Sequence, residues 1–407
     1  MKTNYLLIGG GMASMHAARL IRMKDAAGAI TLVGKEPHLP YDRPPLSKEF
    51  LRGEKEPSQL LFEPRTFFEE KQIETLLGDP VEGLDVAAHT AHLAGGGHIT
   101  FEKALIATGG EPVRLDIPGA DLDGVFYLRS LDDAQAIARR AASGGAALVI
   151  GGGFIGMEAA ASLTALGVEV TVVEALPHIW PGFLDTSLAG FVQEYCEHRG
   201  VRFITGDKVT ALPGAGRSTG AVTASGRTVR CDFVCVGVGI RPETRLAEDA
   251  GLEVTDGIVV NEHLQTSHPD IYAAGDVVNY PDPVFDKRRR VEHWGHAEYC
   301  GQVAGLNMTG DSRTYDLLSY VWSDVFDLHI EFAGDESERD RVLVRGTIGG
   351  TPLTVLYLKD DRLTAYFAIN SNSREFPRLQ RLIRNRTNLA GKDDALRDPD
   401  FDLKTLL

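Results

Sequence analysis

Cysteine is scarce in this sequence, and its spacing excludes two common uses of the residue. The 407 residues include four cysteines, at Cys196, Cys231, Cys235 and Cys300. This spacing matches neither a zinc-binding set nor a Cys-x-x-Cys redox pair. Since structural disulfides are rare under cytosolic reducing conditions, we expect the four thiols to pack in the core, and we expect no metal site.

Basic residues are outnumbered by acidic ones. The chain has 42 lysines and arginines against 57 aspartates and glutamates, which gives a formal net charge of -15 at pH 7. A protein that binds a phosphate backbone needs a broad basic surface. The composition therefore disfavours a nucleic-acid partner, although it is compatible with a local basic patch.

The sequence also shows no export signal and no clear membrane span. Met1–Asn4 leads straight into the apolar segment Tyr5–Ile8, without a charged-then-apolar leader. Ala146–Val170 is apolar enough to suggest a membrane span, but Glu158 interrupts it and its glycines follow a nucleotide-binding pattern. We expect a cytoplasmic protein with no membrane span.

What the chain does contain is an imperfect internal repeat. Leu6–Val33 and Leu148–Val173 each combine an apolar strand, a glycine turn, an alanine-rich helix and a second apolar strand. Apolar strands separated by helices are typical of parallel sheets that are covered on both faces. The repeat therefore predicts an α/β protein with two Rossmann-like dinucleotide-binding domains.

Further patterns suggest where these domains begin and end. Phe101–Gly110 ends in Thr108 and two glycines, as a crossover between domains does, and Asp270–Asp276 has a similar ending that indicates a return to the first domain. From about Trp322 onward, alternating strands and the basic helical segment Arg374–Arg386 predict an α+β module. The predicted domains are residues 1–110 with 241–318, residues 111–240, and residues 319–407.

The first glycine fingerprint consists of Gly9, Gly11 and Ser14, which follow a strand and open a helix. Gly9 permits the tight turn, and Gly11 lets a pyrophosphate approach the amides at the helix N-terminus. Ser14 stands where glycine or alanine is usual, which implies looser packing of the helix on the strand but leaves the anion site intact. The alternative is a glycine turn that holds no ligand.

The second fingerprint is complete, with Gly151, Gly153 and Gly156 at all three positions. The strand Val168–Val173 then ends at Glu174, at the spacing expected for a carboxylate that bonds the ribose hydroxyls. The 2′-phosphate of NADPH would meet this carboxylate where it needs an arginine. The sequence therefore predicts NADH in preference to NADPH.

The segment Tyr41–Lys48 carries a family resemblance. It is similar to the signature of the FAD-dependent ferredoxin reductases that serve oxygenases, a family related to apoptosis-inducing factor and monodehydroascorbate reductase. The resemblance implies a glutathione-reductase-like fold, with FAD in the first site and NADH in the second. It covers nearly the whole chain, including the motifs Ala107–Gly109, Tyr127–Arg129, Ala274–Asp276, Glu292–Trp294 and Trp322–Asp324.

The resemblance also implies roles for single residues. Lys48 is expected beside the flavin N5 and O4, where a cation stabilises negative charge as the ring is reduced. Glu158 is expected near the nicotinamide and paired with Lys48, whereas the plain alternative is a solvated helix position. The other implied cofactor contacts are Ala13, Lys35 and Val81 at the adenosine end, Glu36 at the ribose in place of Gly34, Arg43 and Arg129 at the phosphates, Asp276 at the ribityl or pyrophosphate region, Trp294 and Trp322 along the isoalloxazine, and Thr108, Gly109, Ile155, Gly239, Glu292 and His293.

Related flavoproteins pass electrons to a redox-active cysteine on the first helix or in the loop after the second strand. Here the first helix has no cysteine, and Tyr41–Arg43 occupies the loop position. Electrons must therefore leave from the flavin itself, one at a time. The expected acceptor is a ferredoxin or a similar small acidic redox protein, and a quinone is the alternative. A basic patch would guide the acidic protein, although these side chains could equally form a solvated face: Lys287, Arg288, Arg289, Arg290, Arg374, Arg378, Arg381 and Arg384.

Other functions share these motifs. An NADH dehydrogenase like apoptosis-inducing factor, or a monodehydroascorbate reductase, would differ only in the electron acceptor. A flavoprotein that changes conformation when NADH binds, with a binding or signalling role, is an alternative from another class. A further alternative is that one of the two nucleotide sites is vacant.

Overall fold

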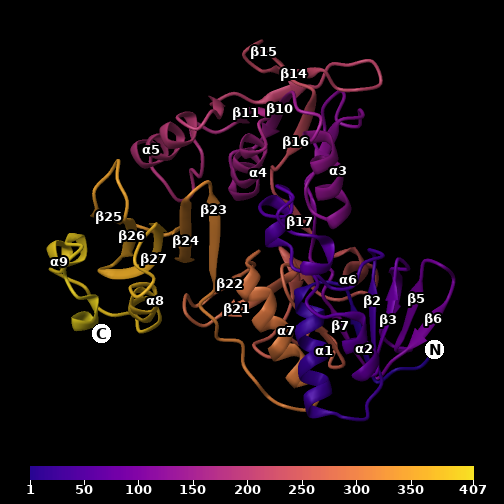
Figure 1. Ribbon diagram of the computed structural model, residues 1–407. Coiled ribbons are helices and arrows are strands. Elements are labelled where there is room, and N and C mark those ends of the chain that lie inside the picture. The colour runs from indigo at the N-terminus through magenta and orange to yellow at the C-terminus, as the bar shows by residue number, and fades with distance from the viewer. The chain divides into compact units, whose positions relative to one another are not determined.

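The computed structural model describes all residues from 1 to 407, and the chain forms two compact units. The chain alternates between them several times along its length (Figure 1). The first unit consists of Met1–Asp42, Ser58–Glu111 and Arg241–Tyr320, and the second of Arg43–Pro57, Pro112–Ile240 and Val321–Leu407. The three domain ranges expected from the sequence stay a prediction.

The first unit is built on a five-stranded parallel sheet, in the order β20-β7-β1-β2-β3. Its helices α1 and α7 lie side by side (Figure 1). They approach so closely that a Cβ at Gly301 would lie 2.2 Å from the main-chain oxygen of Ala13. The bounds are β1 (Tyr5–Ile8), α1 (Met12–Lys24), β2 (Ile30–Gly34), β3 (Ile73–Leu77), β7 (Lys103–Ile106), β20 (Ile271–Ala273) and α7 (Trp294–Met308).

Smaller elements complete the first unit. An antiparallel sheet consists of β4 (Val81–Asp85), β5 (Thr90–Leu93) and β6 (His98–Thr100). A second small sheet consists of β18 (Val254–Thr255), β19 (Gly257–Val259), β21 (Val278–Asp282) and β22 (Lys287–Arg289). The remaining elements are η2 (Pro57–Gln59), α2 (Arg65–Glu70), α6 (Arg245–Asp249), and the paired strands β8 (Gly110–Pro112) and β17 (Ile240–Pro242), at which the chain passes from one unit to the other.

The second unit repeats this plan with the parallel sheet β12-β11-β10-β16-β9. The stretch Ala146–Val170 is therefore a buried strand, a glycine turn and a helix, and no helix of the chain is long and apolar enough to cross a membrane. The bounds are η1 (Pro44–Ser47), β9 (Val125–Tyr127), α3 (Leu131–Ala141), β10 (Ala146–Ile150), α4 (Phe154–Ala165), β11 (Glu169–Glu174), α5 (Thr186–Glu197), β12 (Arg202–Thr205), β13 (Val209–Ala211), β14 (Gly220–Thr223), β15 (Thr228–Arg230) and β16 (Phe233–Val236).

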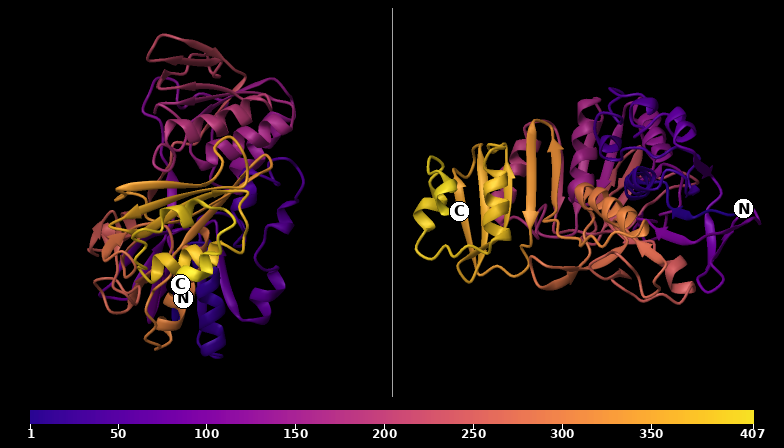
Figure 2. Two further views of the ribbon diagram at one scale, coloured as in Figure 1. Left: turned by 90° about the vertical axis from the view of Figure 1, so that its left-hand side faces the viewer. Right: turned by 90° about the horizontal axis from the view of Figure 1, so that it is seen from below.

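The C-terminal part of the second unit is a five-stranded sheet, β23-β24-β27-β26-β25, whose pairings from β24 to β25 are antiparallel. The helix α8 packs against β27 and β24 (Figure 2). The bounds are β23 (Tyr320–Val325), β24 (Leu328–Gly334), β25 (Arg341–Gly346), β26 (Leu353–Lys359), β27 (Arg362–Ile369), α8 (Phe376–Arg384), α9 (Asp393–Arg397) and η3 (Leu403–Leu406).

One hydrophobic core joins this C-terminal sheet to the parallel sheet of the second unit. Trp180 is part of this core, with its ring centroid 5.4 Å from that of Phe154 on α4 and 5.9 Å from that of Phe367 on β27. The fold class predicted from the sequence, two Rossmann-like folds and an α+β C-terminal part, is confirmed.

Candidate functional site

The two glycine turns are built alike. Gly9, after β1, and Gly151, after β10, both have positive φ, at 122° and 106°. A Cβ at Gly9 would lie 2.1 Å from the main-chain oxygen of Ala107, and one at Gly151 would lie 2.4 Å from that of Gly237. Both positions therefore require glycine, for the turn itself and for the close approach of the neighbouring strand.

The helices after these turns begin without a side-chain cap. The residues at their N-cap positions are Gly11 and Gly153, and neither helix has a side-chain capping bond or an acidic residue in its first turn. A Cβ at either glycine would have no atom within 4 Å. By contrast, Ser130 caps α3 and Asp185 caps α5. The amides at the start of α1 and α4 are thus open to an anion, as a dinucleotide pyrophosphate requires.

The third position of each fingerprint differs between the two turns. A Cβ at Gly156 would lie 2.0 Å from the main-chain oxygen of Gly151, so this helix packs closely on its turn. Ser14 is wholly buried, and its hydroxyl has no hydrogen-bond partner within the protein. Because no water-sized group reaches the hydroxyl, the Ser14 side chain contributes to the interior and not to the open end of α1.

Glu174 lies at the end of β11 and reaches back to the second glycine turn. One of its carboxylate oxygens accepts a 2.6 Å hydrogen bond from the Gly152 amide, and the other accepts a 2.8 Å bond from the Leu176 amide. The carboxylate is thereby held beside the turn, where a ribose-binding acid is expected.

The corresponding place in the first unit has no acid at its strand end, because β2 finishes at Gly34. Two residues later, Glu36 accepts a 2.6 Å hydrogen bond from the Tyr41 hydroxyl. Lys35 pairs with Glu111 at 2.8 Å, and this hydrogen bond raises the pKa of the Lys35 ammonium. Glu36 is therefore the carboxylate nearest in sequence that can serve the first site.

A network of buried polar groups surrounds Glu158 on α4 in the second unit. Glu158 is 3% exposed and Lys48 is 7% exposed. Oε1 of Glu158 accepts from the Lys48 ammonium at 3.1 Å and from the Ser323 hydroxyl at 2.7 Å, while Oε2 accepts from the Ser47 hydroxyl. Three donors, one of them cationic, offset the cost of burying the carboxylate.

Two further predicted residues meet in the same unit. A guanidinium nitrogen of Arg43 donates a 2.7 Å hydrogen bond to the main-chain oxygen of Arg129. Both side chains are half-buried, and Arg43 directly precedes η1, which contacts α4 and α3. The two arginine residues therefore lie next to each other in the second unit.

Some predicted residues of the first unit directly follow β7 and β20 or lie at the start of α7. The indole nitrogen of Trp294 donates to Asp42 at 2.7 Å, and the His293 ring shares a 3.1 Å hydrogen bond with the Ser319 hydroxyl. The Thr108 hydroxyl donates to the main-chain oxygen of Glu243 at 2.7 Å. Trp294 and Thr108 are therefore fixed by contacts within their own unit.

The candidate residues divide between the units. The first unit contains Gly9, Gly11, Ala13, Ser14, Lys35, Glu36, Val81, Thr108, Gly109, Asp276, Glu292, His293 and Trp294. The second contains Arg43, Lys48, Arg129, Gly151, Gly153, Ile155, Gly156, Glu158, Glu174, Gly239 and Trp322. Ile155 is 46% exposed in the first turn of α4.

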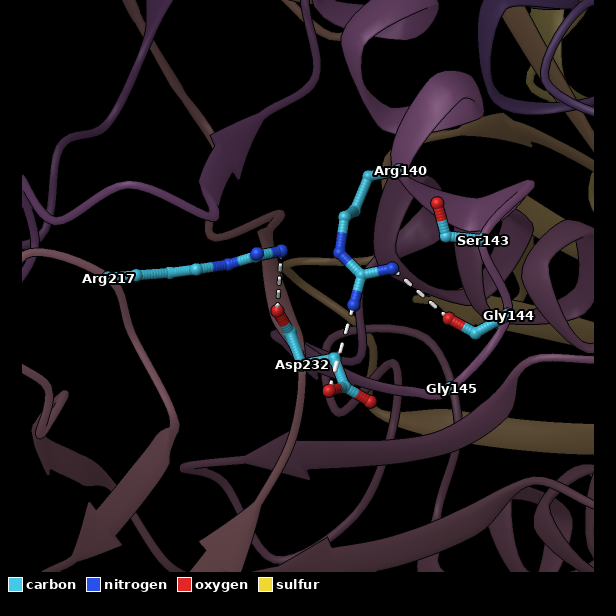
Figure 3. Close-up of a pocket in the computed structure, with 6 residues that line it drawn as sticks. All are labelled: Arg140, Ser143, Gly144, Gly145, Arg217 and Asp232. Carbon is cyan, nitrogen blue, oxygen red and sulfur yellow. Dashed lines mark hydrogen bonds and ion pairs between the residues drawn. The ribbon is translucent and has the colours of Figure 1, made fainter.

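A pocket of about 380 Å³ in the second unit lies away from these residues, at the amino end of β10 and β16 (Figure 3). Arg140 and Arg217 both extend toward Asp232 there, and Asp232 also accepts a 2.8 Å bond from the Ala146 amide. The glycine turns follow the carboxyl ends of their strands, so this cluster joins α3 to the sheet and takes no part in the nucleotide site.

Comparison with known proteins decides the family. Residues 3–301 match the model described as pyridine nucleotide-disulphide oxidoreductase, and residues 320–407 match the model described as reductase C-terminal. The chain belongs to the pyridine nucleotide-disulphide oxidoreductase family. The resemblance carried by the segment Tyr41–Lys48 is confirmed.

Relatives within this family match over nearly the full chain. The sequence is 34% identical over 406 residues to the 5,5'-dehydrodivanillate O-demethylase ferredoxin reductase subunit of Sphingobium sp. (strain NBRC 103272 / SYK-6), covering 98% of this chain and 97% of that one. It is 34% identical over 401 residues to rhodocoxin reductase of Rhodococcus erythropolis, covering 98% and 93%. The solved ferredoxin reductase for the CYP199A2 system from Rhodopseudomonas palustris has a TM-score of 0.93 and 32% identity, covering 99% of each chain.

Membership in this oxidoreductase family agrees with the expected cofactors, FAD and a nicotinamide dinucleotide. The disulphide chemistry in the family's name has no counterpart among the cysteines of this chain, which are all free and buried. Burial raises the pKa of Cys231 to about 11 and the pKa values of Cys196 and Cys235 to about 12. These three thiols stay protonated at neutral pH and are poor nucleophiles.

Sequence reasoning missed three residues of the second unit. Ser47 and Ser323 lie inside the quoted motifs Tyr41–Lys48 and Trp322–Asp324, but nothing in either motif indicates a contact with Glu158. Trp180 carries no sequence signal, although its φ of 48° and its burial mark it as a fixed part of the core. Each contact joins segments that are far apart along the chain.

The buried hydroxyl of Ser14 generates a prediction. Ser14→Ala removes a buried polar group that has no partner, so it should stabilise the FAD-free protein by about 1 kcal/mol and raise its thermal midpoint. The affinity for FAD, measured by quenching of flavin fluorescence, should stay within about twofold, because the hydroxyl does not reach the open end of α1. A lower midpoint, or a large loss of FAD affinity, would show that the hydroxyl has a partner.

Proposed function

We propose that this protein is an NADH-dependent flavoprotein reductase that passes electrons singly to a ferredoxin-type iron–sulfur protein. The observation that carries the proposal is the buried ion pair between Lys48 and Glu158. Glu158 lies on α4, two residues after the last glycine of the complete second fingerprint. The relatives' names support a small redox protein as acceptor, since they include a ferredoxin reductase subunit, rhodocoxin reductase and a rubredoxin-NAD(+) reductase. A cytoplasmic location is part of the same proposal.

When bound, FAD supplies a group that accepts two electrons as hydride from NADH and can release them one at a time. The residues of this chain bind and orient the two nucleotides. The uncapped amides of α1 would hold the FAD pyrophosphate, and those of α4 would hold the NADH pyrophosphate. Arg43 and Arg129 would add positive charge at the phosphates.

Lys48 and Glu158 would control charge at the reacting centre. The carboxylate, held by Ser47 and Ser323, keeps the Lys48 ammonium in one position and balances its charge in a place that is almost free of water. A fixed cation in such a place stabilises negative charge that develops next to it during electron uptake. Because the carboxylate is itself fixed by two hydroxyls, little reorganisation is needed at that moment.

This role predicts a graded effect of two substitutions. Glu158→Gln removes the negative charge while keeping the size of the side chain, so flavin reduction by NADH should slow at least roughly tenfold in stopped-flow absorbance measurements. Ser323→Ala removes one of three donors and should slow it by roughly threefold. The exposed Ser143→Ala is the matched control, with no change. We would abandon the role if Glu158→Gln left both NADH affinity and the reduction rate unchanged.

Glu174 would select the coenzyme. Its carboxylate is held beside the glycine turn by the amides of Gly152 and Leu176, and the following residues up to His178 include no arginine or lysine. The ribose hydroxyls of NADH would gain a charged hydrogen bond there, while the 2′-phosphate of NADPH would be repelled.

Steady-state kinetics test this selectivity. The wild type should have a kcat/KM for NADH at least roughly tenfold above that for NADPH. Glu174→Gln should reduce this ratio, because the amide oxygen can still accept from the Gly152 amide while the repulsive charge is gone. Equal kcat/KM for the two nucleotides in the wild type contradicts the assignment.

The basic residues expected to guide the acceptor fall into two sets of different character. Within Lys287–Arg290, Arg289 pairs with Asp282 at 3.2 Å and Arg290 pairs with Asp256 at 2.8 Å, so much of the positive charge is compensated inside the first unit. On α8, the apolar side chains are buried and the arginines lie on the outer face. Arg381 and Arg384 are exposed, and Arg378 pairs with Asp402. Arg374 precedes the helix. We therefore place the docking surface for an acidic redox protein on α8.

Charge reversal on α8 tests this docking surface. The double substitution Arg381→Glu and Arg384→Glu should raise the KM for ferredoxin by roughly tenfold at low ionic strength, and less at high salt because exposed charges are screened. Reduction of the small acceptor ferricyanide should not change. Arg230→Glu, at an exposed position on β15, is the control. Equal ferredoxin KM values in the wild type and the double variant rule out α8 as the docking surface.

A further inference from the structure

We propose that His89, His268 and Asp270 in the first unit form a site for a divalent transition-metal ion such as Zn²⁺. One ligand atom from each of the three side chains lies within 4.8 Å of the other two, and all three residues are half-buried. His89 directly precedes β5, while His268 and Asp270 precede β20. No sequence motif connects these three residues, because metal-site motifs depend on ligands that are close together in the chain.

The distances agree with ligands on one ion. Nε2 of His89 lies 3.5 Å from a carboxylate oxygen of Asp270. Two ligand atoms bound to tetrahedral Zn²⁺ at the usual bond lengths are roughly 3.4 Å apart. The ring centroids of His89 and His268 are 5.7 Å apart with an interplanar angle of 77°, whereas two imidazoles on one zinc ion have centroids roughly 5 Å apart. Coordination would require the ligand atoms, which lie within 4.8 Å of one another, to move closer together.

The surrounding structure fixes the ligands in place. The His89 ring stacks on the buried Phe101 with centroids 5.5 Å apart, and its main-chain oxygen accepts a 3.0 Å bond from the Phe101 amide. The main-chain oxygen of His268 accepts from the Ile271 amide at 3.2 Å. Nδ1 of His268 accepts only a long 3.3 Å bond from the Asp270 amide, and an ion can replace this bond. Such prior ordering lowers the cost of binding.

The ligand types select the class of ion. Imidazole nitrogens suit zinc, nickel and copper, while magnesium and calcium prefer sets made of oxygen ligands. Two histidines and one carboxylate leave a fourth position for water. The ion would join the small β4-β5-β6 sheet to β20, the edge strand of the parallel sheet. Because the site is at the amino end of β20, away from the glycine turns, the proposal does not depend on the proposed function.

Calorimetric titration of ZnCl₂ into the FAD-loaded, chelator-dialysed protein without a histidine tag tests the site. The wild type should bind one Zn²⁺ per chain and show a higher thermal midpoint with zinc. His89→Ala and His268→Ala should each bind at least roughly tenfold more weakly. His98→Ala, on the exposed part of β6, is the matched control and should bind like the wild type. MgCl₂ should give no binding.

Two results would overturn the metal site. One is the absence of stoichiometric zinc binding to the wild type, and the other is equal zinc affinity in the wild type, His89→Ala and His268→Ala. Either would mean that His89 and Asp270 form a simple ion pair. FAD content and NADH oxidation should be unchanged in His89→Ala, which verifies folding, and Asp270→Asn provides a shape-conserving second variant if a histidine substitution impairs folding.

Discussion

The ion pair between Lys48 and Glu158 is the constraint on which the second unit depends. It fixes three segments at one point, because Lys48 follows η1, Glu158 is on α4, and the Ser323 hydroxyl that supports the pair is on β23. Breaking a buried pair by removing one partner typically costs about 3–5 kcal/mol, since the other charge is left without compensation. The nucleotide fold and the C-terminal sheet are thus joined through charge as well as through the aromatic core around Trp180.

The helix termini show how this fold prepares for ligands. Where α3 and α5 begin, a serine and an aspartate side chain satisfy the first amides. At α1 and α4 the caps are glycines and offer no side chain. A glycine cap in place of a serine or aspartate cap costs only a few tenths of a kcal/mol for each helix. A bound pyrophosphate recovers this energy, so stability and nucleotide binding are linked in each unit.

Local patterns predicted most of the fold, and long-range contacts account for what they missed. The repeat of Leu6–Val33 and Leu148–Val173 was sufficient for two parallel sheets, because strand, turn and helix signals are all short-range. The Glu174 contact follows from the pairing of β10 with β11. The Ser323–Glu158 bond and the compensation of Arg289 by Asp282 are tertiary, and periodicity and motif spacing contain no information about them.

Electron flow from NADH through the flavin to ferredoxin can be followed by anaerobic titration with NADH and subsequent addition of ferredoxin. About one equivalent of NADH should bleach the flavin absorbance. Oxidised ferredoxin should then restore the absorbance in single-electron steps, and NADH-dependent cytochrome c reduction should need added ferredoxin. A flavin that NADH does not bleach would exclude this electron path, and so would a reduced protein that quinones or monodehydroascorbate reoxidise while ferredoxins do not.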